Sequence, residues 1–171
     1  MREPAPHTVS TPSASAPRAT WGSVYMVGIG GWGMSGLARL LRSLGADVSG
    51  SDMTRSDVTD ALESEGIPIL YTQESGDVPE GCQTLIASAA VQPGHPEVMR
   101  GEELGLRVMS YAEALGACMT DRTGVSIAGT HGKSTTAGML GHALIRAGLD
   151  PTVIVGATSR ARGAAGSAAG F

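Results

Sequence analysis

The residues best suited to chemistry lie in the stretch SIAGTHGKSTT, residues 126–136. It ends in Gly132-Lys133-Ser134, which joins a glycine, a lysine and a hydroxyl just before an expected helix. Backbone N–H groups at a helix start attract phosphate, a lysine can reach the terminal phosphates, and a hydroxyl can bind magnesium. The usual phosphate loop has a further glycine where this chain has Ile127, so the match is partial. The stretch nevertheless predicts a site for ATP and Mg²⁺, with Ser134 as a metal ligand.

His131 is the unusual member of this stretch. An imidazole beside bound phosphates can donate a hydrogen bond to them, or add positive charge when protonated. It can equally well only fill the turn, and the residues alone leave both interpretations open. The alternative to a phosphate-binding loop is that these residues only form the start of a helix, in which Lys133 is incidental. We expect His142, inside the following helix, to be a packing or surface residue.

A second glycine-rich loop, GIGGWG, places Gly28, Gly30 and Gly33 in the spacing G-x-G-x-x-G between an expected strand and an expected helix. Glycine permits the tight turn and lets the backbone approach a diphosphate. Asp52 follows at the end of the next expected strand, where an acidic residue typically holds the ribose of NAD. Because any nucleotide diphosphate satisfies this geometry, the glycines do not identify the ligand. A close turn without a ligand remains the alternative.

Short apolar runs alternate with amphipathic stretches along the chain, which is the pattern of a parallel sheet covered by helices. One expected helix carries Leu37, Leu40, Leu41 and Leu44 on one face and is closed by Gly45. The expected strands are residues 24–29, 46–52, 67–70, 84–90, 107–110, 124–129 and 151–156. The expected helices are residues 34–45, 57–66, 95–105, 111–120 and 133–147. We therefore predict an α/β fold, a Rossmann-like parallel sheet followed by the first strand, phosphate loop, helix and strand of a second nucleotide-binding unit.

Composition limits the classes of protein to consider. A net charge of -4 argues against a broad nucleic-acid-binding face. Cys82 and Cys118 lie far apart without the spacing of a metal or redox motif, so we expect both to be small apolar residues in a reducing compartment. The sequence has neither a run long enough to cross a membrane nor the apolar core of a secretory signal, so we expect a soluble, cytoplasmic protein.

Together, VGIGGWGMSGLARLLRSLGADVSGSD and IAGTHGKSTT resemble the Mur ligase family, over residues 24–156. Histidine before Gly-Lys is typical of its alanine-adding and murein-peptide-recycling branches, and the run from Gly30 to Gly36 resembles the alanine-adding branch. The resemblance assigns the first loop to the UDP part of a sugar nucleotide instead of NAD, with Asp52 helping to position it. The implied sugar-nucleotide residues are Gly28, Gly30, Gly31, Gly33, Met34, Ser35, Asp52 and Ser88. The implied ATP-binding residues are Gly129, Thr130, His131, Gly132, Lys133, Ser134 and Thr135, of which Lys133 and His131 are catalytic.

Three positions depart from the pattern of this family. In IASAAVQPGHPEV, Ser88, Pro96 and Glu97 match, whereas Ala89 replaces a serine and His95 an asparagine. Tyr111 stands where the family often has arginine. These departures put polar contacts around the sugar nucleotide in question, and not the resemblance itself.

The resemblance implies an ATP-dependent ligation of L-alanine to UDP-N-acetylmuramate through an acyl phosphate, in peptidoglycan synthesis. It also implies a longer parent chain, with the rest of a central domain and a C-terminal domain, so we expect these 171 residues to be inactive alone. We predict a disordered segment over residues 1–20, a sugar-nucleotide domain over 21–120, the start of an ATP-binding domain over 121–159 and a flexible end over 160–171. A murein-peptide-recycling ligase, an NAD-dependent oxidoreductase and a non-catalytic nucleotide-binding module are the alternatives.

Overall fold

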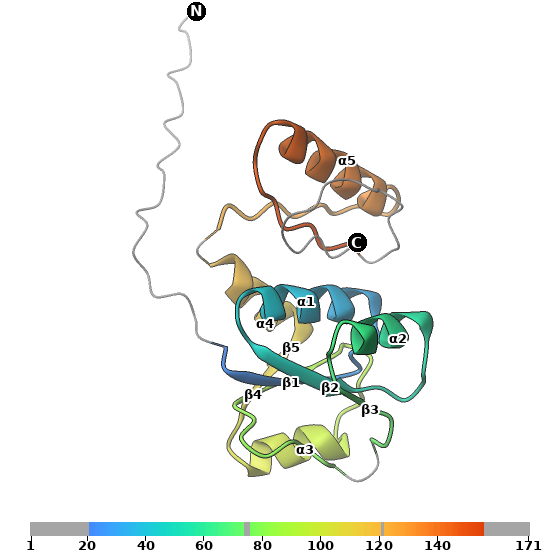
Figure 1. The fold of residues 1–171 in the computed structure, drawn as a ribbon, viewed down its shortest axis with the longest axis vertical. Coiled ribbons are helices and arrows are strands. Elements are labelled where there is room, and N and C mark those ends of the chain that lie inside the picture. The colour runs from blue at the N-terminus through green and yellow to red at the C-terminus, as the bar shows by residue number, and fades with distance from the viewer. Residues whose placement is uncertain (1–20, 74–75, 121, 156–171) are drawn as a thin grey trace, which may run out of the picture.

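The computed structural model describes residues 21–73, 76–120 and 122–155 (Figure 1). The predictions for residues 1–20 and 160–171 lie outside these ranges. Five parallel strands form one sheet in the order β3-β2-β1-β4-β5. The strands are β1 (Ser23–Val27), β2 (Asp47–Ser51), β3 (Ile69–Leu70), β4 (Thr84–Ala87) and β5 (Arg107–Ser110). This is the strand order of a Rossmann-type sheet and confirms the predicted fold class.

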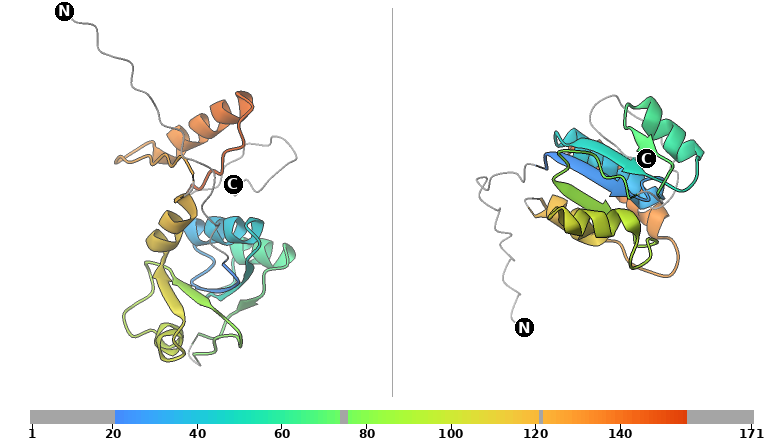
Figure 2. Two further views of the ribbon diagram at one scale, coloured as in Figure 1. Left: turned by 90° about the vertical axis from the view of Figure 1, so that its left-hand side faces the viewer. Right: turned by 90° about the horizontal axis from the view of Figure 1, so that it is seen from below.

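The helices cover both faces of the sheet, as Figures 1 and 2 show. Helices α1 (Trp32–Ser43), α2 (Asp57–Ser64) and α4 (Tyr111–Met119) lie on one face, and α3 (Pro96–Glu103) lies on the other. An apolar core lies on each face of the sheet, and β1 contributes side chains to both, because successive side chains of a strand point to opposite faces. Val24 and Met26 face α1, whereas Tyr25 and Val27 face the side of α3. A strand buried on both faces explains the continuous apolar run in the sequence.

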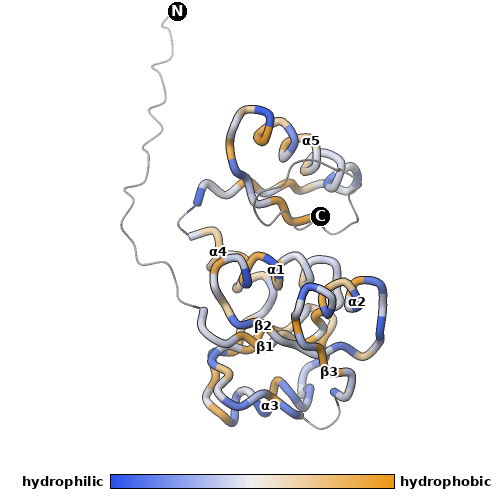
Figure 3. Tube along the Cα trace, in the orientation of Figure 1, coloured by the Kyte–Doolittle hydropathy of each residue, from blue (hydrophilic) through white to orange (hydrophobic). Residues whose placement is uncertain are grey.

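Helix α1 forms as its sequence predicts. Leu37, Leu40 and Leu41 are buried beneath it, and Leu44 packs against the same core. Gly45 follows with a φ of 89°, the left-handed conformation that favours glycine after a helix. Figure 3 shows that apolar and polar segments alternate along the described part of the chain, and not only in α1. Cys82 and Cys118 are both buried and free, in agreement with their expected packing function.

Two predicted strands are wrong. Residues 124–129 and the described part of 151–156 form no strand, and Val125 is 60% exposed. A strand needs a neighbour for its backbone hydrogen bonds, and in the described part of the chain the paired strands all belong to the sheet of residues 23–110. The helix predicted between them does form, as α5 (Lys133–Arg146), with Gly148 at a φ of 78° after its end.

Residues 150–155 lie between α5 and α1 instead of extending a sheet. A methyl group placed on Gly141 of α5 would lie 2.7 Å from Val153, and one placed on Gly36 of α1 would lie 3.3 Å from Ile154. The two glycines therefore let this segment approach both helices closely. The apolar side chains of α5 are partly covered, since Leu140 and Leu144 are half-buried, whereas Met139 is 69% exposed. In the described residues, no helix is long and apolar enough to cross a membrane.

Candidate functional site

The first glycine loop lies where the order of the sheet reverses. Strands β2 and β4 flank β1 on opposite sides, and ligands of such sheets bind at the carboxyl ends of the strands beside this point. Gly28 directly follows β1 with a φ of 76°, a conformation that side chains other than glycine rarely adopt. A methyl group on Gly28 would also lie 3.0 Å from Cβ of Ser88, which follows β4. The structure thus brings Gly28 and Ser88 together, as the prediction of one site requires.

The end of β2 holds this loop in place. The carbonyl oxygen of Ser51 accepts hydrogen bonds from the amides of Gly28 at 2.8 Å and Ile29 at 3.0 Å. The next residue, Asp52, accepts the amide of Gly30 at Oδ2, 2.8 Å away, and the amide of Thr54 at Oδ1, 3.2 Å away. Asp52 therefore binds the backbone of the glycine loop itself. Gly30 has to be small for this contact, because a methyl group there would lie 2.8 Å from Asp52 Oδ2.

The loop ends at the start of α1, where Gly31 is the N-cap residue without a capping side chain. The first N–H groups of a helix have no partner inside it and can donate to an anion. Met34 and Ser35 are each 3% exposed, and the Ser35 hydroxyl donates to the carbonyl oxygen of Trp32. The structure thus leaves these two side chains facing the protein, so that a ligand contact of Met34 would use its backbone N–H.

Gly33 and Tyr111 adjoin each other at the same edge of the sheet. A methyl group on Gly33 would lie 3.0 Å from the phenol ring of Tyr111. Tyr111 is one of the three positions at which the sequence departs from the pattern of the family that it resembles. Tyr111 begins α4 directly after β5, and its pKa is raised by burial. An uncharged aromatic ring therefore borders the glycine loop.

The second glycine loop lies at the N-terminus of α5. Gly132 is the N-cap residue with a φ of 75°, and Gly129 has a φ of 152°. The Lys133 ammonium bends back over the loop and donates to the carbonyl oxygen of Gly129 at 2.6 Å and of Thr130 at 3.4 Å. His131 and Ser134 are exposed beside it. The structure therefore brings a cation, a hydroxyl and an imidazole to one helix start, as the sequence predicts. His142, farther along α5, is exposed.

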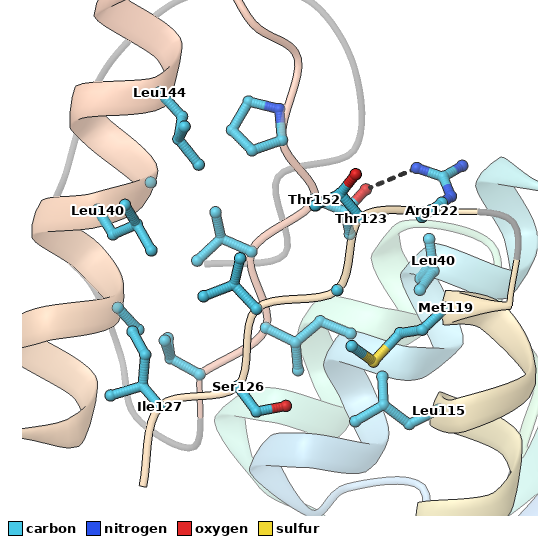
Figure 4. A pocket seen from close by; sticks show the side chains of 18 of the residues that line it. Leu40, Leu115, Met119, Arg122, Thr123, Ser126, Ile127, Leu140, Leu144 and Thr152 are labelled. Atoms are coloured by element: carbon cyan, nitrogen blue, oxygen red, sulfur yellow. Dashed lines mark hydrogen bonds between the residues drawn. The ribbon is translucent and has the colours of Figure 1, made fainter. Parts of the chain in front are cut away.

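A cleft of about 760 Å³ adjoins this helix start. Figure 4 shows Leu40 of α1 and Leu115 of α4 on one wall, with Leu140 and Leu144 of α5 on the other. Arg122 reaches across to the Thr152 hydroxyl at 3.5 Å. The lining also includes polar side chains, among them Arg122, Lys133 and Ser134.

One functional candidate was missed in the sequence. Glu97 matches the family pattern but has no predicted function, and the structure buries it completely on the face of α3. Its carboxylate accepts hydrogen bonds from the hydroxyls of Tyr25, at 2.7 Å, and Ser51, at 2.6 Å. Pro-Glu at a helix start indicates an exposed first turn as readily as a buried one. Only the fold reveals that this glutamate lies beneath the sheet.

A Rossmann-type sheet with glycine loops at the starts of two helices defines a nucleotide-binding α/β protein. Comparison with known proteins is more specific: residues 23–123 match the family described as "Mur ligase family, catalytic domain". The chain belongs to the Mur ligase family.

Curated relatives and solved structures agree with this assignment. The chain is 47% identical over 141 residues to the UDP-N-acetylmuramate–L-alanine ligase of Kineococcus radiotolerans, covering 81% of this chain and 30% of the relative. It is 43% identical over 140 residues to the ligase of the same name from Laribacter hongkongensis, covering 82% and 30%. The chain thus spans about 30% of the length of these relatives.

Two solved structures share the fold. The UDP-N-acetylmuramate–alanine ligase of Thermotoga maritima superposes with a TM-score of 0.68 at 28% identity, covering 73% of this chain and 29% of that one. The UDP-N-acetylmuramate:L-alanyl-gamma-D-glutamyl-meso-diaminopimelate ligase of Neisseria meningitides superposes with a TM-score of 0.75 at 30% identity, covering 82% and 44%. Ligases named for alanine and for the peptide L-alanyl-gamma-D-glutamyl-meso-diaminopimelate are therefore both among its structural relatives.

Proposed function

We propose that this chain forms the sugar-nucleotide-binding part, and the start of the ATP-binding part, of a ligase that joins L-alanine to UDP-N-acetylmuramate. The observation that carries the proposal is the 47% identity over 141 residues to a ligase of that name. A stretch covering 81% of this chain has to include both Asp52 and Lys133, and the family match over residues 23–123 includes the first glycine loop. The chain spans 30% of that relative, and we propose that the rest of a central domain and a C-terminal domain complete the enzyme.

In this proposal the first loop binds the UDP diphosphate. The left-handed turn at Gly28 directs the chain into α1, whose first N–H groups are available to an anion. Asp52 is already bound to the Gly30 and Thr54 amides, so we assign to it the positioning of the loop rather than a ribose contact. This assignment favours a UDP-sugar over NAD, for which an acidic residue at this place would hold the ribose.

The second loop would bind ATP. The Lys133 ammonium lies over the loop at 2.6 Å from the Gly129 carbonyl oxygen, from where it can turn to a phosphate oxygen. His131 is exposed at the same helix start and can donate to a phosphate. Gly129, Thr130, Gly132 and Thr135 contribute the surrounding backbone. Lys133 would stabilise the charge of the phosphoryl group during its transfer from ATP to the lactyl carboxylate of the sugar nucleotide. The alanine amine would then attack the carbonyl carbon of this acyl phosphate and displace inorganic phosphate.

Magnesium would be held by the Ser134 hydroxyl together with the nucleotide phosphates. A hydroxyl at the start of a helix after Gly-Lys is a suitable oxygen ligand for this ion. In the part of the chain that the structure describes, no group of three His, Cys, Asp or Glu residues could hold a metal ion. The nucleotide phosphates would therefore supply most of the oxygen ligands that this part of the chain does not. Since ATP is the phosphoryl donor, we place the reaction in the cytoplasm.

Murein-peptide recycling is the second candidate, because the ligase from Neisseria meningitides has the higher TM-score of the two structures, 0.75 against 0.68. Both names begin with UDP-N-acetylmuramate, so the assignment of the first loop is the same for either branch. The amino acid or peptide would distinguish them in the full-length enzyme.

Calorimetric titration of the 171-residue chain with UDP-N-acetylmuramate and with NADH tests the assignment of the first loop. We expect saturable heat with the UDP-sugar and none with NADH. A signal with NADH alone would favour the oxidoreductase alternative and contradict the proposal.

A further inference from the structure

The buried carboxylate of Glu97 lies under the carboxyl end of β2. Glu97 is completely buried in the first turn of α3, between the sheet and the helix. Burying a carboxylate is costly unless hydrogen bonds replace its water. Each oxygen of the carboxylate accepts its own hydrogen bond: Oε1 lies 2.7 Å from the Tyr25 hydroxyl, and Oε2 lies 2.6 Å from the Ser51 hydroxyl. One carboxylate therefore connects α3 to two strands of the sheet.

Both hydroxyls act as donors to Glu97. The amide of Gln73 donates to the Ser51 oxygen at 3.0 Å, which leaves the single proton of Ser51 for the carboxylate. Burial, and then the hydrogen bond to Glu97, raise the pKa of Tyr25, so its phenol keeps its proton. The imidazole Nδ1 of His95 lies 3.9 Å from Oε2, beyond a hydrogen bond. Hydrogen bonds to a charged acceptor are stronger than those between neutral groups, so Glu97 holds both hydroxyls firmly.

Ser51 carries this restraint to the first glycine loop. Its side chain binds Glu97, while its carbonyl oxygen accepts the amides of Gly28 and Ile29 at 2.8 and 3.0 Å. The same residue therefore faces the buried carboxylate on one side and the loop on the other. The backbone of Tyr25 has no such link, because it lies in the middle of β1, in register with Ser49 and Leu85. Its hydroxyl meets Ser51 only at the side chain, so Tyr25→Phe leaves both the Ser51–Glu97 bond and the Ser51 carbonyl contacts in place.

We propose that Glu97 is a positioning residue which, through Ser51, fixes the first glycine loop in the geometry that binds the diphosphate of the sugar nucleotide. The proposal rests on the function proposed above for that loop. The two hydroxyls that donate to Glu97 should therefore differ in their effect. Loss of the Ser51 hydroxyl should disturb the glycine loop, and loss of the Tyr25 hydroxyl should not.

Three variants of the 171-residue chain test this difference. Ser51→Ala and Tyr25→Phe each remove one hydroxyl donor from Glu97, and Glu97→Gln removes the charge but leaves the bond from Gln73 to Ser51. We expect UDP-N-acetylmuramate to bind about tenfold more weakly to Ser51→Ala and Glu97→Gln, a loss of about 1.4 kcal/mol, and less than twofold more weakly to Tyr25→Phe. Equal losses in Ser51→Ala and Tyr25→Phe would overturn the proposal, since a purely structural carboxylate would respond to both alike.

Amide hydrogen exchange, measured by NMR without ligand, provides an independent readout. The Gly28 and Ile29 amides should exchange about tenfold faster in Ser51→Ala and Glu97→Gln than in the wild type, with other amides of the sheet as the reference. In Tyr25→Phe these two amides should change no more than that reference. Faster exchange across the whole sheet in all three variants would overturn the proposal. If the wild-type chain binds no UDP-sugar, the proposed function fails, and the exchange rates still decide whether Glu97 positions the loop.

Discussion

The amide nitrogen of Gly30 lies 2.8 Å from Oδ2 of Asp52, so that the residue expected to hold a nucleotide closes the glycine loop instead. The contact connects the loop after β1 to the residue after β2. It also changes the reason for a glycine at this position. Even without a ligand, Gly30 leaves the space that Asp52 and Thr59 occupy, because both would lie 2.8 Å from a methyl group at this position.

Gly30→Ala should therefore destabilise the loop even without ligand. The added methyl group would overlap with Asp52 and Thr59, and overpacking of this kind costs about 1 to 3 kcal/mol. Gly31→Ala is the matched control, because its methyl group would find its nearest neighbour at 3.6 Å, an ordinary contact. Thermal unfolding should show a lower melting temperature for Gly30→Ala only. Equal melting temperatures would mean that Asp52 is not held against the loop. Gly30→Val should additionally weaken the binding of the UDP-sugar.

Lys133→Ala should weaken ATP binding and leave UDP-sugar binding unchanged, because the two loops serve different ligands. Each hydrogen bond from a charged donor is worth about 1.5 to 3 kcal/mol, so we expect a loss of at least tenfold. Titration of both ligands into the variant checks this, and Arg146→Ala, at the other end of α5, is a control that removes a similar charge. Undiminished affinity for ATP would remove Lys133 from the site. In the full-length enzyme the same change should abolish most ligation.

Cys118 should resist alkylation in the folded chain. Burial raises the pKa of this thiol from 9.0 to about 11, so the reactive thiolate is on the order of a hundredfold rarer near pH 8 than in the unfolded chain. Because the raised pKa favours the protonated thiol in the folded state, its contribution to stability is complete below pH 9.0 and is lost as the pH rises toward 11. Mass spectrometry of iodoacetamide-treated peptides, with a urea-unfolded sample as control, checks the first result. Comparable labelling of the two samples would contradict it.

Acidification should weaken the start of α4. The backbone and side chain of Ser110 donate to the Glu113 carboxylate at 2.8 and 2.7 Å, and these bonds lower its pKa below 4.5. Because the carboxyl of Glu113 has a lower pKa in the folded chain than in the unfolded chain, it stabilises the fold at pH values above 4.5. This contribution is lost as the pH falls from 4.5 through the lowered pKa of the folded chain. Ser110→Ala removes the cap, at a cost of about 1 kcal/mol. Its stability, measured by denaturant unfolding, should depend less on pH below 4.5 than that of the wild type. An unchanged slope would contradict the assignment.

The sequence predicts the first sheet well because local signals and packing agree there. The leucines of α1 and the apolar run of β1 each have one stable arrangement, buried against the other. The strands predicted at residues 124–129 and 151–156 have equally apolar sequences but no described neighbour to pair with. A strand depends on a partner in a way that the helix between them, α5, does not, because a helix makes its backbone hydrogen bonds internally.

The candidate sites divide in the same way. The conformations of Gly28 and Gly132 follow from local chain geometry and could be predicted from glycine in a loop before a helix. The partners of Asp52 and Glu97 could not, because they depend on which strand ends become neighbours in the sheet. The ligand contacts proposed for both loops, and the boundaries of the proposed domains, stay predictions.

The central claim, that two glycine loops bind two different ligands, is tested most directly by NMR of the isotope-labelled 171-residue chain. Amide signals would be followed while UDP-N-acetylmuramate and then Mg-ATP are added to one sample. We predict that the UDP-sugar shifts the amides of residues 28–34 and leaves those of residues 129–135 in place, and that Mg-ATP does the reverse. Shifts of residues 28–34 by Mg-ATP alone, with no response to the UDP-sugar, would contradict the account.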